Sequence, residues 1–296
     1  MPLSYLLMKY GLCVLKRKSG MSWGKATPSK ESSVMEEAFV DLALDFREIW
    51  RFHGDGGREW LGALQRYFRS KLVRQTSTGG YDPKSNGDVE NRIGIMLRMM
   101  KAAHAQSGVP FKAWDTSYEH AQEVYVRLPN KSHGKEPPLL QELRDVDPAT
   151  ADEEFAKEDV NTWPAYGTEC MAYVHKELRP ERLSEHSEKC VFLGWDRTVV
   201  HGIKVGVLKS MFELQEDPIK RVATATAASF HPGKFPLIRW RRISKVDDTK
   251  ELEEIIANTD EPIDQSLQFG QSVSSGYIIG QIGPDGRVHG VGKEIN

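Results

Sequence analysis

The chain has 296 residues, of which 39% are hydrophobic, and its formal net charge is -2. This length can bury one good-sized core and a second small one. The charge excludes a uniformly basic nucleic-acid binder, although it permits a local basic face. The three cysteines are widely separated and form no CxxC pair, which indicates a reducing compartment, nuclear or cytoplasmic, and no zinc site.

The N-terminal stretch is apolar from Leu3 to Leu15, with one interruption at Lys9. No cationic segment precedes it and no small-residue cleavage site follows, so we expect paired strands at 5–8 and 11–15 instead of a targeting segment. Residues 16–33 are polar and are predicted to form a loop. Nothing else approaches the ~20 apolar residues of a membrane span, so we expect no membrane contact.

Two helix–strand units are predicted between residues 32 and 76. Apolar residues near helical spacing predict a helix over 35–46, capped by Ser32 or Ser33, and a strand over 49–53 follows it. A second helix is predicted over 61–72 and a short strand over 73–76. The apolar face of this second helix would consist of Leu61, Leu64, Phe68 and Leu72. Such alternation is typical of an α/β fold.

A turn-rich loop over 76–86 precedes a long helix that starts at Gly87. A further helix is predicted from Val109 through 121–126, ending at Leu128. The buried stripe of the long helix would consist of Val89, Ile93, Met96, Met100 and Ala103.

The second half of the chain changes in character. Residues 137–160 are acidic and contain three prolines, which predicts a solvated linker with one short helix around 151–157. Alternating apolar residues then predict the strands of a small β-domain. These strands are expected at 165–175, 188–195, 199–208 and 221–230, followed by a helix candidate within 239–260 and a hairpin within 272–291.

Two acids stand out because of their surroundings. Asp55 follows a strand end and is flanked by glycines, while Glu90 lies in the first turn of the long helix, one turn before Gly94. Carboxylates placed in this way can hold divalent ions for phosphoryl transfer on DNA. The structural alternative is that Asp55 belongs to an ordinary turn and that Glu90 stabilises the helix dipole.

The surroundings of these acids resemble copia-type retrotransposon integrases, which have a DDE, ribonuclease H-like catalytic core. The first motif is matched by Arg51, His53, Asp55, Gly57, Glu59 and Trp60. The second is matched by Tyr81, Pro83, Asn86, Gly87 and Glu90. Two motifs separated by about 35 residues are much harder to obtain by chance than either alone.

The resemblance implies an α/β, ribonuclease H-like core that is incomplete at its N-terminus, followed by a small SH3-like β-barrel. The core would span 1–130, an acidic linker 131–162, the barrel 163–238 and a tail 239–296. Asp55 and Glu90 would be catalytic and would bind Mg²⁺ or Mn²⁺. DNA is the implied partner, with a homo-oligomer as an option. The residues expected to contact DNA are Lys84, Asn86, Arg92, Arg98 and Lys101.

Charge supports a DNA contact in this region. Between Arg66 and Lys101 there are eight basic residues against three acidic ones, which can attract phosphates. A solvated helix face is the alternative explanation. His53 could act as a general base or merely pack at the strand end. Glu59 and Trp60 are expected to cap and anchor the following helix.

The family pattern breaks at the first acid of the triad. The aspartates upstream of Asp55 are Asp41 and Asp45, and both fall in the predicted helix 35–46 instead of at a strand end. Two carboxylates without the third would hold metal poorly. We therefore expect an N-terminally truncated integrase core that is defective in DNA integration. The alternative is a non-catalytic nucleic-acid-binding or protein-interaction module derived from an integrase.

Overall fold

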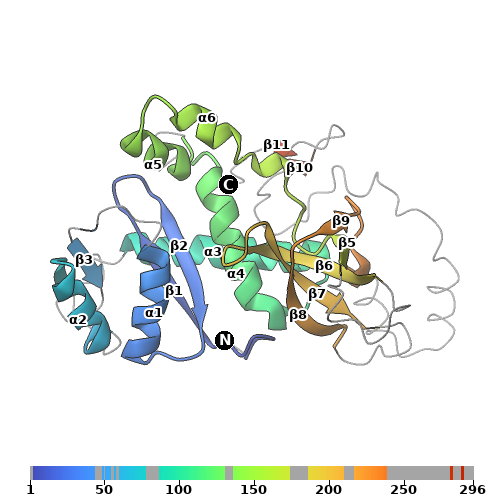
Figure 1. Ribbon diagram of the computed structural model, residues 1–296, viewed down its shortest axis with the longest axis horizontal. Helices are drawn as coiled ribbons and strands as arrows, with labels where there is room; N and C mark the ends of the chain where they lie inside the picture. The colour runs from blue at the N-terminus through green and yellow to red at the C-terminus, as the bar shows by residue number, and fades with distance from the viewer. Residues whose placement is uncertain are drawn as a thin grey trace, which may run out of the picture.

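The computed structural model describes residues 3–43, 49, 51–54, 57, 60–77, 87–130, 136–173, 186–209 and 217–238, and the short strands at 281–282 and 288–289. Helix α4 (Trp114–Arg127) lies between an N-terminal hairpin and a five-stranded sheet (Figure 1). The helix candidate within 239–260 lies outside the described residues.

The chain begins with an antiparallel hairpin of strands β1 (Tyr10–Leu15) and β2 (Ser22–Thr27). The strand predicted at 11–15 is confirmed, but the loop predicted over 16–33 is wrong because it contains β2. Ser22 and Thr27 are buried together with the apolar residues of β2, so this strand lacks the period-two alternation that would indicate it.

Residues 5 and 6 form a turn and residues 7 and 8 have no regular secondary structure, so the strand predicted at 5–8 is wrong. The hydroxyl of Ser4 accepts the backbone N–H groups of Leu6 at 3.2 Å and Met8 at 3.0 Å. The backbone N–H of Ser4 also donates to the Met8 carbonyl at 3.0 Å. These bonds close the segment on itself, as serine side chains commonly do in turns.

Both predicted helix–strand units are confirmed within a few residues. Helix α1 (Ser32–Ala43) precedes β3 (Arg51–Gly54), and helix α2 (Ala63–Ser70) precedes β4 (Arg74–Ser77). β3 and β4 are parallel and form a two-stranded sheet separate from β1–β2. Among the described residues, each of these four strands pairs with a single neighbour.

The predicted apolar face of α2 is only half correct. Leu64 and Phe68 are fully buried, whereas Leu61 is 51% exposed and Leu72 is 90% exposed. The helix is shorter than predicted and ends at Ser70, so Leu61 and Leu72 lie beyond its ends. Ser32 ties α1 to this region, because its hydroxyl donates to the Leu61 carbonyl.

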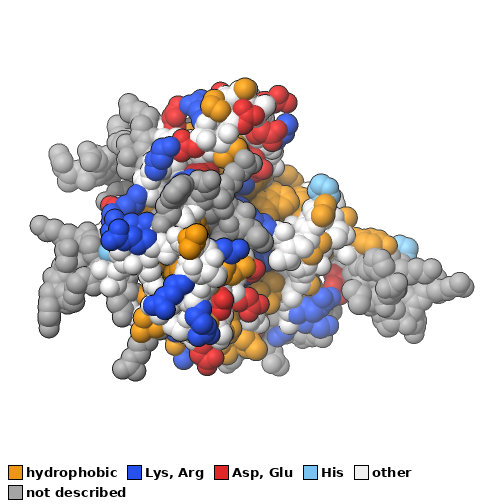
Figure 2. All heavy atoms as spheres, turned by 60° about the vertical axis from the view of Figure 1, so that its left-hand side comes forward, with side chains coloured by type: hydrophobic (Ala, Val, Ile, Leu, Met, Phe, Trp, Pro, Cys, Tyr) orange, Lys and Arg blue, Asp and Glu red, His pale blue; other side chains and the backbone are white. Residues whose placement is uncertain are grey.

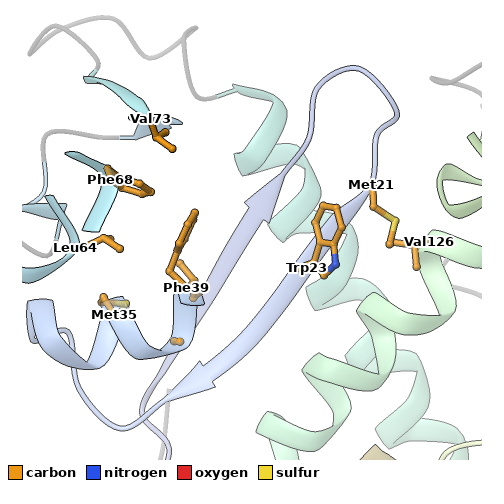
Figure 3. Packing of buried hydrophobic residues seen from close by; sticks show 10 residues of the cluster. Met21, Trp23, Met35, Phe39, Leu64, Phe68, Val73 and Val126 are labelled. Atoms are coloured by element: carbon orange, nitrogen blue, oxygen red, sulfur yellow. The ribbon is translucent and has the colours of Figure 1, made fainter. Parts of the chain in front are cut away.

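One hydrophobic core joins the hairpin to the two helix–strand units, α1–β3 and α2–β4. Phe39 of α1 is fully buried and meets Phe52 of β3 and Phe68 of α2 edge-on, with ring centroids 5.5 and 4.9 Å apart. Figure 3 shows Phe39 on the side of Leu64 and Phe68, with Trp23 on the hairpin. Edge-to-face pairs of this kind each contribute about 0.5–1.5 kcal/mol beyond area burial.

Helix α3 (Gly87–Ser107) confirms the predicted long helix, and α4 follows a short 3₁₀ turn, η3 (Phe111–Ala113). Met96 and Met100 are fully buried, as the predicted stripe requires, but Ile93 is 37% exposed. The predicted stripe is therefore buried at Met96 and Met100 but partly exposed to solvent at Ile93, nearer the start of the helix.

Helix α4 contacts both halves of the molecule. On one side, the Tyr118 hydroxyl donates to the Leu12 carbonyl at 2.9 Å. Gly24 of β2 has no room for a side chain there, because an added Cβ would lie 2.7 Å from atoms of Tyr118 and Gln122. On the other side, Glu119 pairs with Lys204 of the five-stranded sheet at 2.5 Å.

The predicted acidic linker contains more structure than expected. It forms α5 (Pro138–Val146), α6 (Ala151–Ala156) and the 3₁₀ turn η5 (Val160–Thr162). The α6 prediction is confirmed, whereas α5 was not predicted. Glu142 of α5 is 9% exposed and accepts hydrogen bonds from Lys16 at 2.5 Å and Ser19 at 2.9 Å. This part of the segment therefore packs on the hairpin.

The predicted β-domain is an antiparallel sheet in the order β8-β7-β6-β5-β9. A closed SH3-like barrel is not observed: β8 and β9 lie at opposite edges and do not pair with each other in the described parts of the chain. The strands are β5 (Glu169–Tyr173), β6 (Ser187–Asp196), β7 (Gly202–Leu208), β8 (Ile219–Ala225) and β9 (Ala228–Phe230).

The hairpin predicted within 272–291 is confirmed by β10 (Gln281–Ile282) and β11 (Val288–His289), which pair antiparallel. None of the helices that the structure describes is long and apolar enough to cross a bilayer.

Candidate functional site

The candidate site begins at the carboxyl ends of the parallel strands β3 and β4. β3 ends at Gly54, immediately before Asp55, which itself lies outside the described residues. The carboxyl ends of parallel strands meet at one edge of a sheet, and open α/β sheets bind their ligands there. The local fold thus places the residue before Asp55 at an edge suited to ligand binding.

His53 and Thr76 face each other at this edge, paired across β3 and β4. His53 Nδ1 lies 2.9 Å from the Thr76 hydroxyl oxygen. That hydroxyl oxygen also lies 3.3 Å from the Phe52 carbonyl oxygen, and it accepts from Arg51 Nε at 3.3 Å. A hydroxyl has one proton, so the Thr76 hydroxyl donates either to the Phe52 carbonyl or to Nδ1, according to the tautomer of His53. His53 Nε2 is buried and has no hydrogen-bond partner among the described residues.

Glu90 lies in the first turn of α3, where its side chain is exposed. Asp88 in the same turn pairs with Arg17 at 3.3 Å, whereas none of the described cations forms an ion pair with Glu90. A carboxylate oxygen free of a competing cation is a donor that Mg²⁺ accepts. Stabilisation of the helix dipole explains the position of Glu90 equally well.

Gly94 lies one turn after Glu90. An added Cβ at Gly94 would lie 3.7 Å from Nη1 of Arg98, so the Arg98 guanidinium folds back over this glycine. A cationic group therefore lies beside Gly94, one turn from Glu90. Arg98 and Lys101, both predicted to contact DNA, are exposed on α3.

Arg92, also predicted to contact DNA, is buried. The Arg92 residue is only 3% exposed. Its Nη1 donates a hydrogen bond to the Ser22 hydroxyl at 2.8 Å, and its guanidinium lies 3.9 Å from the centre of the Tyr125 ring. Burial lowers the pKa of this guanidinium. The position argues against the predicted DNA contact: Arg92 holds α3 to the hairpin and to α4.

Several other predicted residues are not brought together in the described parts of the chain. Lys84, Asn86 and Asp45 lie outside them. Asp41 lies on α1 and pairs with Lys25 of β2, so it is placed in a helix and not at a strand end. Within the described ranges, no three histidine, cysteine or acidic side chains are grouped so that they could hold a metal ion.

The exposed basic residues extend beyond α3. Between residues 60 and 77 the sequence contains four basic residues and no acid. Figure 2, which brings the α2 side of the molecule forward, shows separate groups of Lys and Arg side chains. The four residues, all exposed, are Arg66, Arg69, Lys71 and Arg74. This stretch therefore presents basic side chains without an acidic residue among them.

Thr76 is the residue of this site that the sequence did not indicate. Its role depends on lying opposite His53 in the parallel pair, and on both side chains pointing to the same face. A short strand of common residues carries no signal for such a register. A threonine near a strand end is otherwise unremarkable in sequence.

No protein-family model and no curated protein matches the chain. Similar solved structures include three of retroviral integrases. The catalytic core domain of HTLV-2 integrase, in complex with magnesium and in a trimeric form, has a TM-score of 0.37 and 15% identity, covering 43% of this chain and 79% of that chain.

Two further structures are of the same class. The catalytic core domain of BIV integrase has a TM-score of 0.37 and 13% identity, covering 49% of this chain and 89% of that chain. The simian T-cell lymphotropic virus intasome in complex with PP2A regulatory subunit B56 gamma has a TM-score of 0.40 and 14% identity, covering 73% of this chain and 72% of that chain. The TM-scores of these three structures are all below 0.5, so the similarity carries no conclusion about function.

Proposed function

We propose that the chain is an integrase-derived, copia-type module that binds DNA, with Asp55 and Glu90 as the ligands of Mg²⁺ or Mn²⁺. The observation that carries the proposal is the spacing of the two motifs, about 35 residues, together with the elements that bear them. The first motif starts on β3, which ends one residue before Asp55, and the second ends in the first turn of α3, which contains Glu90.

The donor chemistry fits such a metal. Both residues are carboxylates, and Mg²⁺ and Mn²⁺ prefer oxygen ligands. When bound, the ion would neutralise charge on the oxygens of a phosphodiester during transesterification. The chain's own contribution is to hold Glu90 at the start of a long helix, free of the ion pair that engages Asp88.

The basic residues would hold the DNA backbone. Arg98 and Lys101 are exposed on the helix that carries Glu90, and the exposed stretch 60–77 adds four cations without an acid. Arginine and lysine bind phosphates and release the counterions of DNA, which makes binding salt-dependent. Asn86 is a matched position of the second motif, and Lys84 lies between two such positions. Both remain proposed DNA contacts.

We expect replacement of Arg98 by alanine to weaken DNA binding and to reduce the slope of log affinity against log salt by about 0.9, the loss of one phosphate contact. Arg92→Met is the matched variant, because Arg92 is buried against Ser22 and Tyr125. It should leave the slope unchanged. Fluorescence anisotropy of a labelled duplex between 25 and about 200 mM salt measures both.

The result for the two arginines decides between surface and interior roles. Equal slopes in wild type and Arg98→Ala would remove Arg98 from the DNA-binding surface. A reduced slope in a stably folded Arg92→Met would restore the predicted contact of Arg92. Absence of salt-dependent DNA binding by the wild-type chain would contradict the proposed function itself.

We further propose that strand transfer is weak or absent in this chain. Asp41 supports this view, because it lies on α1 in an ion pair with Lys25 and is not at a strand end. Purified chain incubated with DNA ends and Mg²⁺ or Mn²⁺ should give no joined product on a gel. Metal-dependent joining that Glu90→Gln abolishes would contradict the loss of activity and would make the chain an active integrase.

A second candidate function is a non-catalytic nucleic-acid-binding or protein-interaction module. It is favoured by the same position of Asp41. Under this alternative, DNA binding would be salt-sensitive but unaffected by divalent metal or by Asp55→Asn. We also propose that the chain forms a homo-oligomer, that its location is intracellular, and that residues 131–162 divide it into two parts.

A further inference from the structure

Leu72 is the most exposed large hydrophobic residue in the described parts of the chain, with 90% of its surface accessible. It follows the end of α2 with φ +56°, in the left-handed region. The Leu72 N–H donates to the Arg69 carbonyl at 3.1 Å, and the Val73 N–H donates to the Phe68 carbonyl at 2.8 Å. Helices commonly end in this pair of bonds, and glycine is the favoured residue there. Leucine at this position is strained and gains no burial within the chain.

The turn that presents Leu72 lies among cations. We call Lys71 and Leu72 the Leu72 turn. Lys71, Arg69 and Arg74 are all exposed, and residues 60–77 contain no acid. An exposed apolar side chain beside cations is complementary to a surface that has an apolar lining and an acidic rim.

A surface of that kind lies elsewhere on the same chain. A groove of about 550 Å³ lies between α5 and α6. Val146 in its lining is 38% exposed, so apolar surface is accessible there. Residues 143–154 contain five acids and one base. Figure 2 shows acidic and hydrophobic side chains together at the top of the molecule, where Figure 1 places α5 and α6. The groove is lined by Leu143, Val146, Asp147, Thr150, Ala151 and Glu154.

One acid of the groove has no cationic partner among the described residues. Glu154 pairs with Lys157 at 2.8 Å, whereas Asp147 accepts a hydrogen bond from the Thr150 hydroxyl at 2.7 Å and forms none of the described ion pairs. In Figure 1, α5 and α6 lie at the top and α2 lies at the lower left. The Leu72 turn and the groove of one chain are therefore too far apart to meet, and a contact between them joins two chains.

We propose that the Leu72 turn of one chain docks in the α5–α6 groove of a second copy, with Leu72 against Leu143 and Val146 and with Lys71 beside Asp147. The contact gives the proposed homo-oligomer its two surfaces and does not require DNA binding. Because the two surfaces differ, each chain offers one turn and one groove.

The first test removes the leucine side chain without changing charge. Leu72→Gly should weaken self-association roughly tenfold, the value of burying one leucine, and should not lower the midpoint of urea unfolding. Leu7→Gly is the matched control, because Leu7 is also exposed and has φ +61° but lies outside the basic stretch. It should leave association unchanged. Sedimentation velocity at a series of protein concentrations measures association.

The second test changes the groove. Glu154→Lys places a cation in the lining and should weaken association, whereas Glu153→Lys makes the same change on α6 outside the lining and should not. Leu72→Gly and Glu154→Lys are then mixed at a concentration at which neither associates alone. The intact groove of the first and the intact turn of the second can meet, so the mixture should form dimers.

A mixture that stays monomeric, or Leu72→Gly that associates as wild type does, would overturn the inference. Wild type that is monomeric at every concentration would overturn it together with the proposed homo-oligomer. Salt-dependent binding of a labelled duplex by that monomer, measured by fluorescence anisotropy, would leave the DNA-binding proposal standing. Weaker DNA binding by Leu72→Gly with unchanged association would make Leu72 a DNA contact and overturn the docking.

Discussion

Lowering the pH from 6.5 to 4 should reduce the free energy of unfolding by about 2 to 3 kcal/mol through His120 alone. His120 lies on α4 where this helix meets Phe192 of β6 and Tyr166. Burial lowers its pKa from 6.5 to about 4, and the nearby charge of Glu123 opposes this only in part. The ring therefore stays neutral in the folded protein under conditions in which the unfolded chain takes up a proton.

The direction of the change in stability with pH follows from the pKa of His120 in the unfolded and in the folded chain. Above pH 6.5 neither state binds the proton, and the contribution to stability is fully present. Between 6.5 and about 4 only the unfolded chain binds it, so stability falls with pH. Urea unfolding at a series of pH values, for wild type and His120→Gln, measures the effect. His186→Gln is the control, because His186 is exposed.

The difference between the variants isolates His120 from the acids that also titrate at low pH. Wild type and His186→Gln should lose stability in parallel between pH 6.5 and 4, and His120→Gln should lose less. Equal losses in all three proteins would show that His120 is accessible to protons in the folded state. The packing of α4 on β6 would then be looser than described.

Gly108→Ala should cost roughly 2 to 5 kcal/mol of stability, which combines left-handed strain with overpacking. Gly108 follows the last residue of α3 with φ +72°, and its N–H donates to the His104 carbonyl at 3.1 Å. An added Cβ would lie 2.4 Å from backbone atoms of Leu237 and Ile238. Backbone atoms cannot move aside as a flexible side chain can, so α3 would separate from this segment.

Gly233→Ala is the matched control. Gly233 also has a positive φ, +79°, but an added Cβ would have no atom within 4 Å. It should cost only the left-handed strain, roughly 1 to 2 kcal/mol. Thermal or urea unfolding of the two variants measures the difference. Equal costs would mean that the end of α3 does not pack against residues 237–238 in solution.

The order of elements could be predicted wherever one apolar face dominates. Helices α1, α3 and α4 and strands β3 and β4 appear close to their predicted positions because helical spacing and strand length were clear. Strand β2 was missed because Ser22 and Gly24 do not look like core residues. Ser22 is buried and Gly24 has no room for a side chain, because α4, about 90 residues away in sequence, packs over the hairpin.

The site was predictable as a pair of motifs but not as a set of contacts. Sequence placed Glu90 in the first turn of a helix and Asp55 after a strand, and the elements agree. It could not separate exposed Arg98 from buried Arg92, because both lie on one helix and only packing against Ser22 distinguishes them. Likewise the opposition of His53 and Thr76 depends on strand register.

The most direct test of the proposed metal site is the DNA affinity of three proteins with and without Mn²⁺: wild type, Glu90→Gln and Asp88→Asn. Asp88 is the matched control, since it lies in the same turn but pairs with Arg17. Mn²⁺ should raise the affinity of wild type and Asp88→Asn and leave that of Glu90→Gln unchanged. An unaltered response to Mn²⁺ in Glu90→Gln, or none in wild type, would contradict Glu90 as a metal ligand and leave the chain as a DNA-binding module without a metal centre.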